Sequence, residues 1–304
     1  MKTIYIIVAL FGLFHDEYTG GMKISPVCSV NDEFPEYLLD SDCIGISDPN
    51  TDTVVAMVQA VERALAFYAI NQNLELSSVY EYYYLDANMD NNYNNQKSHW
   101  IAEFNTHLKG FSYEIDKMYF TDNKELVLTL DVYENVDSAS EVDVNGSFMY
   151  HYDYLNDKSD YGEKIIFNIT STDLIKNLKW ESTIDNDRII KKSYINDKFH
   201  EFECENVICE YDEKMKGKMM FAENKYSLWD CFLDTFFQAI SVFESESVVI
   251  ESTNRQIAID NNDEFNDKNQ NIIRSVIKTR ISCRHTKIIL KNNVLYADWE
   301  INEI

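Results

Sequence analysis

Residues 86–90 place oxygen-bearing side chains at alternate positions, as the first residues of a calcium-binding loop do. Such a loop needs oxygen ligands at positions one, three and five, glycine at six and glutamate at twelve. Here Asn91 stands at the sixth position and Lys97 at the twelfth, and an ammonium group cannot bind a cation. The pattern therefore predicts a solvated polar loop over residues 86–96.

Histidines are the other residues suited to metal or acid–base chemistry. None of them has the H-x-x-x-H or H-x-x-E-H spacing that holds zinc on one helix. His99 and His107 fall in one predicted helix, but they are eight residues apart, which is too far to share an ion. We expect surface or structural roles for all six: His15, His99, His107, His151, His200 and His285.

Motifs for nucleophilic or phosphate chemistry are absent from the sequence. The chain has no G-x-S-x-G, P-loop or G-x-G-x-x-G motif, and it has only 8 glycines. Its 52 acidic residues form so many close pairs that no glycosidase acid and nucleophile can be singled out. We therefore predict that the protein is not an enzyme and has no catalytic, cofactor-binding or metal-binding residue and no cofactor. The alternative is an exported, glycan-directed hydrolase that uses carboxylates.

Aromatic side chains alternate along several strand-like segments. Phe148, Tyr150, Tyr152 and Tyr154 would share one face of a strand. An exposed stripe of this kind can bind sugars or peptides, and a buried one packs within the sheet. The spacing by itself favours packing.

The net charge of −25 excludes nucleic acid and anionic membrane surfaces as preferred partners. Residues 268–297 are the exception, because they carry seven basic residues and no acidic one. That stretch is interpreted as a basic strand paired with acidic strands. A patch for an acidic partner is the alternative.

The N-terminus predicts export. Lys2 is followed by about eleven apolar residues, which is typical of a signal peptide and too short to span a bilayer. The alternative is a buried first strand, because no small-x-small cleavage site follows. We expect residues 1–20 to be removed, leaving a periplasmic, secreted or cell-surface protein with no integral membrane segment.

Six cysteines in an exported protein permit three disulfides, in fifteen possible pairings. Cys204 and Cys209 are close enough along the chain to bridge a turn. Cys231 is expected to be a buried free thiol on the apolar side of a helix. The remaining three are Cys28, Cys43 and Cys283.

Periodicity and capping residues predict the main elements. Strong helices are expected over residues 53–72, capped by Thr51 or Asp52, and 228–243, where Ser227 and Asp230 give a capping-box pattern. A short helix is expected over residues 98–108, ending at Gly110. The expected strands lie at residues 79–85, 148–154, 165–169 and 248–259, with hairpins at 111–132 and 279–301 and a helical turn at 173–178.

Each half of the chain thus has a strong helix, a strand, a polar loop and a hairpin. We predict an α+β fold of antiparallel sheets, each packed by one main helix. The two halves, which a distant duplication would relate, are an N-terminal α+β unit at residues 21–140 and a second α+β unit at 141–304.

Residues 45–49 (GISDP) and 58–66 (VQAVERALA), followed by the hairpin at 117–132, resemble the LPP-twenty type of exported bacterial lipoprotein domain over about residues 41–133. The chain lacks the family's lipid-attached cysteine. The resemblance implies a small exported α+β unit with a binding or assembly role, and it carries over no site residue.

Together these observations predict an exported protein of the cell envelope with a non-enzymatic binding or assembly role. Its expected partner is an envelope protein or a glycan.

Overall fold

The computed structural model describes residues 41, 43–87, 94–121, 124–155, 158–172, 178–185, 188–195, 198–205, 219–223, 227–247, 251–261, 264–291 and 294–304. The predicted signal peptide at residues 1–20 lies outside this range. So do residues 88–90 of the loop that resembles a calcium site, residues 173–177 of the expected helical turn, and Cys28 and Cys209.

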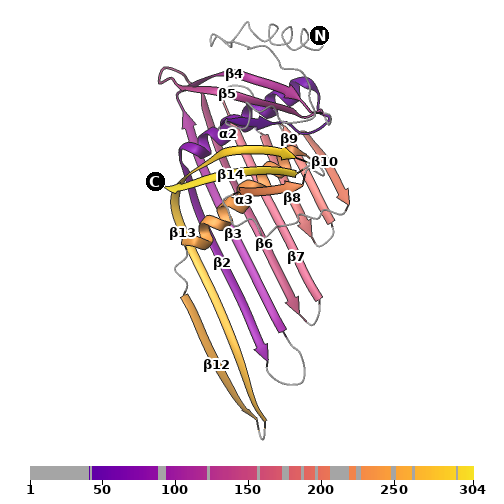
Figure 1. Cartoon of the computed structure of the whole chain (residues 1–304), viewed down its shortest axis with the longest axis vertical. Coiled ribbons are helices and arrows are strands. Elements are labelled where there is room, and N and C mark those ends of the chain that lie inside the picture. The colour runs from indigo at the N-terminus through magenta and orange to yellow at the C-terminus, as the bar shows by residue number, and fades with distance from the viewer. Residues whose placement is uncertain are drawn as a thin grey trace.

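Most of the described residues belong to one antiparallel sheet of eleven strands, in the order β10-β9-β8-β7-β6-β3-β2-β13-β14-β11, with β12 paired to β13 (Figure 1). Its strands are β2 (Leu74–Ala87), β3 (Asn94–Lys109), β6 (Glu141–Leu155), β7 (Lys158–Ser171), β8 (Leu178–Asp185), β9 (Arg188–Ile195), β10 (Lys198–Glu205), β11 (Met219–Glu223), β12 (Glu251–Asn261), β13 (Glu264–Lys291) and β14 (Val294–Glu303).

A second sheet has three strands, β1 (Ile44–Ile46), β5 (Leu126–Glu134) and β4 (Phe111–Phe120), in the order β1-β5-β4. Two helices occur in the described part of the chain, α2 (Thr53–Gln72) and α3 (Leu228–Ser247). The predicted α+β class is therefore wrong, because the fold is β-rich. Segments expected to be polar loops, such as the start of β13, continue as long strands, since a sheet partner satisfies their backbone groups.

The predicted helix over residues 98–108 is also wrong, because this segment is the body of β3. Trp100, Ala102 and Phe104 are buried, whereas Ile101 and Glu103 between them are exposed. A period of two belongs to a strand with one buried face. Gly110 adopts φ 68° at the turn into β4, so the glycine ends a strand and not a helix.

The two strong helices are confirmed. α2 has the predicted bounds, and Val54 N–H donates to Asp52 Oδ1 at 2.9 Å as an N-terminal cap. At α3, Asp230 N–H donates to Ser227 Oγ at 3.0 Å, and the helix continues beyond the predicted end to Ser247. By length and composition α2 is apolar enough to cross a membrane, but it is mostly buried inside the protein.

The predicted hairpins are confirmed as β4–β5 and β13–β14. The strands expected at residues 148–154 and 165–169 lie within β6 and β7, which pair with each other. The basic stretch lies in β13 and pairs with acidic neighbours, because Arg280 faces Glu75 on β2 with 2.5 Å between Nη2 and Oε1. This pairing supports the interpretation as a basic strand. Strands from both predicted units share the large sheet, and the division near residue 140 stays a prediction.

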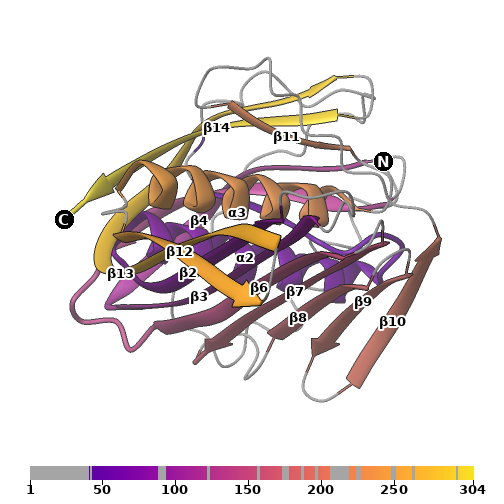
Figure 2. The same ribbon diagram turned by 90° about the horizontal axis from the view of Figure 1, so that it is seen from below.

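Both helices pack on one face of the large sheet, which we call the inner face. α2 lies between this sheet and the three-stranded sheet (Figure 1). The C-terminal half of β13 curls with β14 and β11 back over α3, which is therefore enclosed on two sides (Figure 2). The opposite face of the sheet, the outer face, carries the exposed side chains of the alternating strands.

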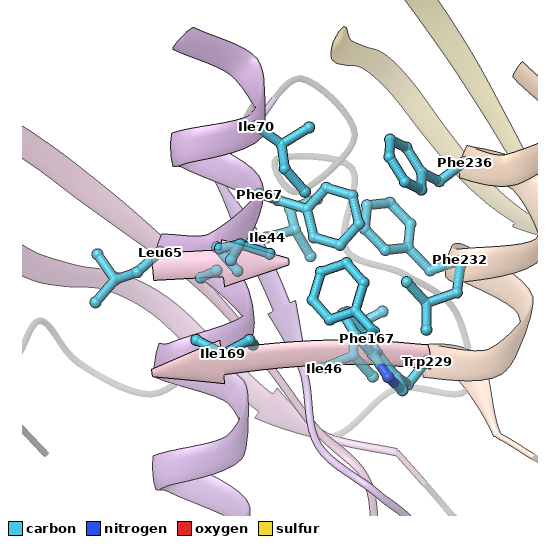
Figure 3. Close-up of a cluster of buried hydrophobic side chains, with 14 of the residues drawn as sticks. Ile44, Ile46, Leu65, Phe67, Ile70, Phe167, Ile169, Trp229, Phe232 and Phe236 are labelled. Carbon is cyan, nitrogen blue, oxygen red and sulfur yellow. The ribbon is translucent and has the colours of Figure 1, made fainter. Parts of the chain in front are cut away.

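Phe67 of α2 lies at the centre of the core. Its ring contacts Phe167 of β7 and the Trp229, Phe232 and Phe236 rings of α3, with centroid distances from 4.7 to 5.9 Å (Figure 3). Edge-to-face and offset contacts of this kind add to the burial energy of the rings. The cluster therefore joins α2, α3 and the sheet into one core.

Candidate functional site

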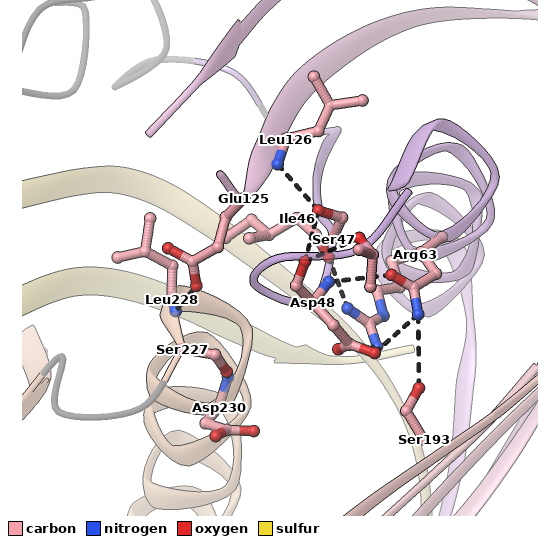
Figure 4. Close-up of polar contacts among 12 residues, drawn as sticks. Ile46, Ser47, Asp48, Arg63, Glu125, Leu126, Ser193, Ser227, Leu228 and Asp230 are labelled. Carbon is pink, nitrogen blue, oxygen red and sulfur yellow. Dashed lines mark hydrogen bonds and ion pairs between the residues drawn. The ribbon is translucent and has the colours of Figure 1, made fainter. Parts of the chain in front are cut away.

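A buried polar network connects β1, α2 and the large sheet (Figure 4). Arg63 on α2 donates through Nη2 to Asp48 Oδ1 and through Nη1 to the Ile46 carbonyl, both at 2.7 Å. Gln59, one turn earlier, donates to Asp48 Oδ2 at 2.7 Å and accepts from Asp48 N–H at 3.0 Å. The Asp48 carboxylate thus has a charged and a neutral partner, and these partners balance its charge in a buried position.

Glu125 extends these polar contacts to α3. The side chain is fully buried, and Oε1 accepts from Leu228 N–H at the start of the helix at 2.6 Å. Burial raises the pKa of the Glu125 carboxyl to about 7, the charges of Asp230 and Asp48 add to the rise, and the hydrogen bonds from Leu228 and Thr121 oppose it. The ionised carboxylate is also attracted by the partial positive charge of the helix dipole at the N-terminus of α3.

These groups hold the elements together and do not form a binding site. Arg63, Gln59 and Glu125 are each at most 1% exposed. Arg63 and Gln59 both bond to Asp48, and Glu125 bonds to the Leu228 backbone and the Thr121 hydroxyl. A pKa near 7 is typical of a general acid, but the buried Glu125 contacts a helix N-terminus in the place where a substrate would have to lie. The sequence did not single out this network, because its members come from distant parts of the chain: the Glu125–Leu228 and Gln59–Ser193 bonds span 103 and 134 residues.

The inner face continues beyond α3 and carries aromatic side chains there. Phe148 on β6 stacks on Phe237 of α3 with centroids 5.2 Å apart, and Trp100 on β3 lies 4.5 Å from Phe148. Figure 1 shows β2, β3, β6 and β7 extending past α3 towards their far ends. Residues further along these strands with the same parity therefore lie on the inner face but outside the enclosed core.

Two adjacent cross-strand rows make up this region, which we call the aromatic face. Tyr80, Trp100 and Tyr150 are register partners on β2, β3 and β6, and Tyr82, Ser98 and Tyr152 form the next row. The four tyrosines are half-buried, and Trp100 is 7% exposed. Neighbouring strands are about 4.8 Å apart, so Tyr80, Trp100 and Tyr150 occupy adjacent positions in the first row. In the second row Ser98 separates the two tyrosines.

The polar groups of the aromatic face are suited to hydrogen bonding. Burial raises the pKa of Tyr80, and the neighbouring Tyr82 and Tyr150 add to the rise. Burial also raises the pKa of Tyr150, against a hydrogen bond with Ser98. Both hydroxyls therefore stay protonated and able to donate near neutral pH. The indole Nε1–H of Trp100 is buried and has no hydrogen-bond partner among the described residues.

The predicted aromatic stripe is thus divided between two roles. Phe148 packs in the core, whereas Tyr150 and Tyr152 belong to the aromatic face, and the side chain of Tyr154 lies outside the described set. Sequence alternation indicated the shared face of β6. It did not indicate that Tyr80, Tyr82 and Trp100 from β2 and β3 line up beside it, because strand order is not encoded locally.

The outer face carries a row of aliphatic side chains. Val276, Val79, Ile101 and Met149 are successive register partners across β13, β2, β3 and β6. Val276 is 65% exposed and Ile101 is 46% exposed. The row is one residue wide. So narrow an apolar strip is ordinary on a protein surface and does not by itself indicate a binding site.

The histidines occupy separate positions in the fold. His99 and His151 face each other on the outer face with ring centroids 6.5 Å apart, and His285 is buried. His107 lies beside Glu141 and Asp143, and these three are the described residues whose ligand atoms come close enough to hold a metal ion. His15 and the side chain of His200 lie outside the described set.

Lys97, at the twelfth position of the rejected calcium loop, forms an ion pair with Asp153 at 2.6 Å. Cys43, Cys231 and Cys283 are buried. For Cys231 this agrees with the prediction. The bridge suggested between Cys204 and Cys209 involves Cys209, which the structure does not describe.

Comparison of the chain with protein-family models, with curated proteins and with solved structures finds no match.

Proposed function

We propose that this is an exported, non-enzymatic binding protein of the cell envelope, and that it holds an uncharged carbohydrate chain on the aromatic face. The observation that carries the proposal is the alignment of Tyr80, Trp100 and Tyr150 in one row beside Tyr82 and Tyr152 in the next. The N-terminal pattern of residues 1–20 supports the export component, and the resemblance to the lipoprotein domain supports a binding role.

The chemistry of the aromatic face suits a sugar. The half-buried tyrosine rings offer flat apolar surfaces on which the C–H groups of a pyranose can pack, and their hydroxyl groups can bond to sugar hydroxyls. Trp100 Nε1–H is a buried donor without a partner among the described residues, and such a donor gains most from a ligand acceptor.

The charge of the protein narrows the ligand class. A net charge of −25 opposes nucleic acids, phosphorylated polymers and acidic polysaccharides through long-range repulsion. A neutral glycan avoids this cost and needs no ion pair from the aromatic face. The partner expected from the sequence, a glycan of the envelope, is therefore narrowed to an uncharged one.

A titration with neutral oligosaccharides tests the proposal. Trp180, Trp229 and Trp299 are at most 3% exposed in the core, so a change in tryptophan fluorescence on binding should come from Trp100. We expect one or more of cellohexaose, xylohexaose, maltohexaose and N-acetylchitohexaose to change this fluorescence. Calorimetry should give a matching affinity. The Tyr80→Ala and Tyr150→Ala variants should each weaken binding at least tenfold.

Tyr133→Ala is the matched control, because Tyr133 is an exposed tyrosine on β5 of the other sheet. It should leave the affinity unchanged. Binding that is equal in the Tyr80 and Tyr133 variants, or no binding to any member of the panel, would contradict the proposed site. Fractionation of native cells with intact-mass measurement tests export separately, since loss of about the first twenty residues is expected.

A further inference from the structure

His107 lies between two carboxylates on the outer face, at the end of β3. Its Nδ1 is 2.6 Å from Asp143 Oδ1, and its Nε2 is 3.2 Å from Glu141 Oε1. Asp143 is the register partner of His107 on the neighbouring β6, and Glu141 lies two residues away on the same face. The imidazole and both carboxylates are about half exposed, so they are open to ions from solution.

The backbone positions of these residues are fixed by the sheet. Glu141 N–H donates to Thr172 Oγ1 at 3.0 Å, and Thr172 N–H donates to the Glu141 carbonyl at 3.1 Å. The turn that follows His107 is closed by a hydrogen bond from Gly110 N–H to the Ser140 carbonyl at 2.9 Å. The three side chains therefore extend from a rigid base, as a metal site requires.

The hydrogen bonding of the ring leaves one nitrogen facing an oxygen. A neutral imidazole donates from one nitrogen and accepts at the other. In the tautomer that donates from Nδ1–H to Asp143 over 2.6 Å, the Nε2 lone pair is directed at the Glu141 carboxylate. Two acceptors 3.2 Å apart repel each other unless a cation lies between them, and that cation is either a proton or a metal ion.

We propose that His107 Nε2 and the Glu141 carboxylate bind a divalent transition-metal ion, with Asp143 holding the imidazole through Nδ1–H. Two ligand atoms each about 2.1 Å from a tetrahedral ion lie about 3.4 Å apart, close to the 3.2 Å found here. A carboxylate that accepts the second ring N–H is the usual outer partner of a zinc-bound histidine. Calcium and magnesium are disfavoured, because they prefer oxygen ligands alone.

Two protein ligands leave the other coordination positions to water or to a further molecule. Binding requires Nε2 without its proton, so protons compete with the metal and the affinity falls as the pH is lowered. The site is on the face opposite the aromatic face, and this inference is independent of the proposed function.

Titration of the full chain with ZnCl₂ and with NiCl₂, each as the metal alone, tests the inference. Cysteine thiols also bind zinc, so the readout should be specific for the ring. Two-dimensional NMR of the histidine side-chain nitrogens should show the His107 Nε2 resonance shifting on addition of metal at pH 7.5. The apparent affinity should be at least tenfold lower at pH 5.5.

Three variants and one control complete the test. His107→Gln should abolish this binding, Glu141→Gln should weaken it at least tenfold, and Asp143→Asn should weaken it roughly 10- to 100-fold through the lost orientation of the ring. His99→Gln is the control, because His99 is an exposed histidine on the same strand and face, and it should bind as the parent chain does. Thermal melts without metal establish that each variant is folded.

Two results would contradict a metal site at His107. If the His107 resonances respond to pH but not to either metal, the cluster is an imidazolium held by two carboxylates and the inference is wrong. Metal binding that persists unchanged in both His107→Gln and Glu141→Gln also overturns it, because the metal then binds elsewhere.

Discussion

The guanidinium of Arg63 lies 4.3 Å from the centroid of the Trp229 ring while it bonds to Asp48 at 2.7 Å. One fully buried cation on α2 is thus held by an aromatic ring of α3 and by a carboxylate that follows β1. Because a buried charge without a partner is costly, the contact makes the packing of these three elements interdependent.

Removal of the Asp48 carboxylate should therefore destabilise the protein strongly. We expect Asp48→Ala to lower the free energy of unfolding by about 3–5 kcal/mol, because Arg63 then stays buried without its counter-charge. The double variant Asp48→Ala with Arg63→Met should lose less than the sum of the two single variants. Urea unfolding of all four proteins measures the coupling, and simple additivity would show that the ion pair does not connect the elements.

Glu125 should make stability depend on pH. Its pKa is about 7 in the folded protein and near 4.5 when unfolded, so between these values the folded state binds more protons. The stabilisation is complete below pH 4.5 and is lost as the pH rises through 7, by an amount on the order of 3 kcal/mol. Glu125→Gln should flatten this slope when unfolding is measured from pH 5 to 8. If the dependence of stability on pH is the same in Glu125→Gln, it arises from other ionisable groups.

Gly45 should tolerate no side chain. A Cβ at this position would lie 1.7 Å from the Ala60 carbonyl oxygen, so β1 and α2 would have to separate. We expect Gly45→Ala to destabilise the protein by about 3 kcal/mol or more. Gly110→Ala is a useful comparison, because its Cβ would lie 3.3 Å from the Asn135 carbonyl oxygen, a much milder contact, and the main cost of about 1 kcal/mol comes from the positive φ. Thermal unfolding should show the larger loss of stability for Gly45→Ala. Equal losses for the two variants would argue against the close contact between Gly45 and Ala60.

The corrected assignment of residues 98–108 has its own test. In a helix, Ile101 and Phe104 would share a face, whereas in β3 they point to opposite faces. Phe104 contacts Phe236 and Phe237 of α3, and we expect Phe104→Ala to cost about 3–5 kcal/mol. Ile101→Thr should change stability by less than about 0.5 kcal/mol, since the side chain is exposed. If chemical denaturation shows similar losses of unfolding free energy for the two variants, a helix over residues 98–108 would be favoured instead.

Local patterns predicted the elements whose signals lie within one segment. The 3.6-residue period and the Asp52 and Ser227 caps located α2 and α3, and alternation around short turns located the β4–β5 and β13–β14 hairpins. β3 was misassigned because it carries exposed Ile101 on its outer face and buried Ser98 and Thr106 on its inner face, which weakens the period of two.

The composition and sequence of the chain by themselves determined its acidic surface, its two long helices and its hairpins, because these depend on residue type and on spacing over a few residues. Only the tertiary structure decided the fold class and the sites. Pairing of β2 with β13 connects residues about 190 positions apart, and pairing of β3 with β6 brings Trp100 to Tyr150 and His107 to Asp143. Strand order is set by which apolar faces the whole chain can bury together, and no short stretch of sequence contains that information.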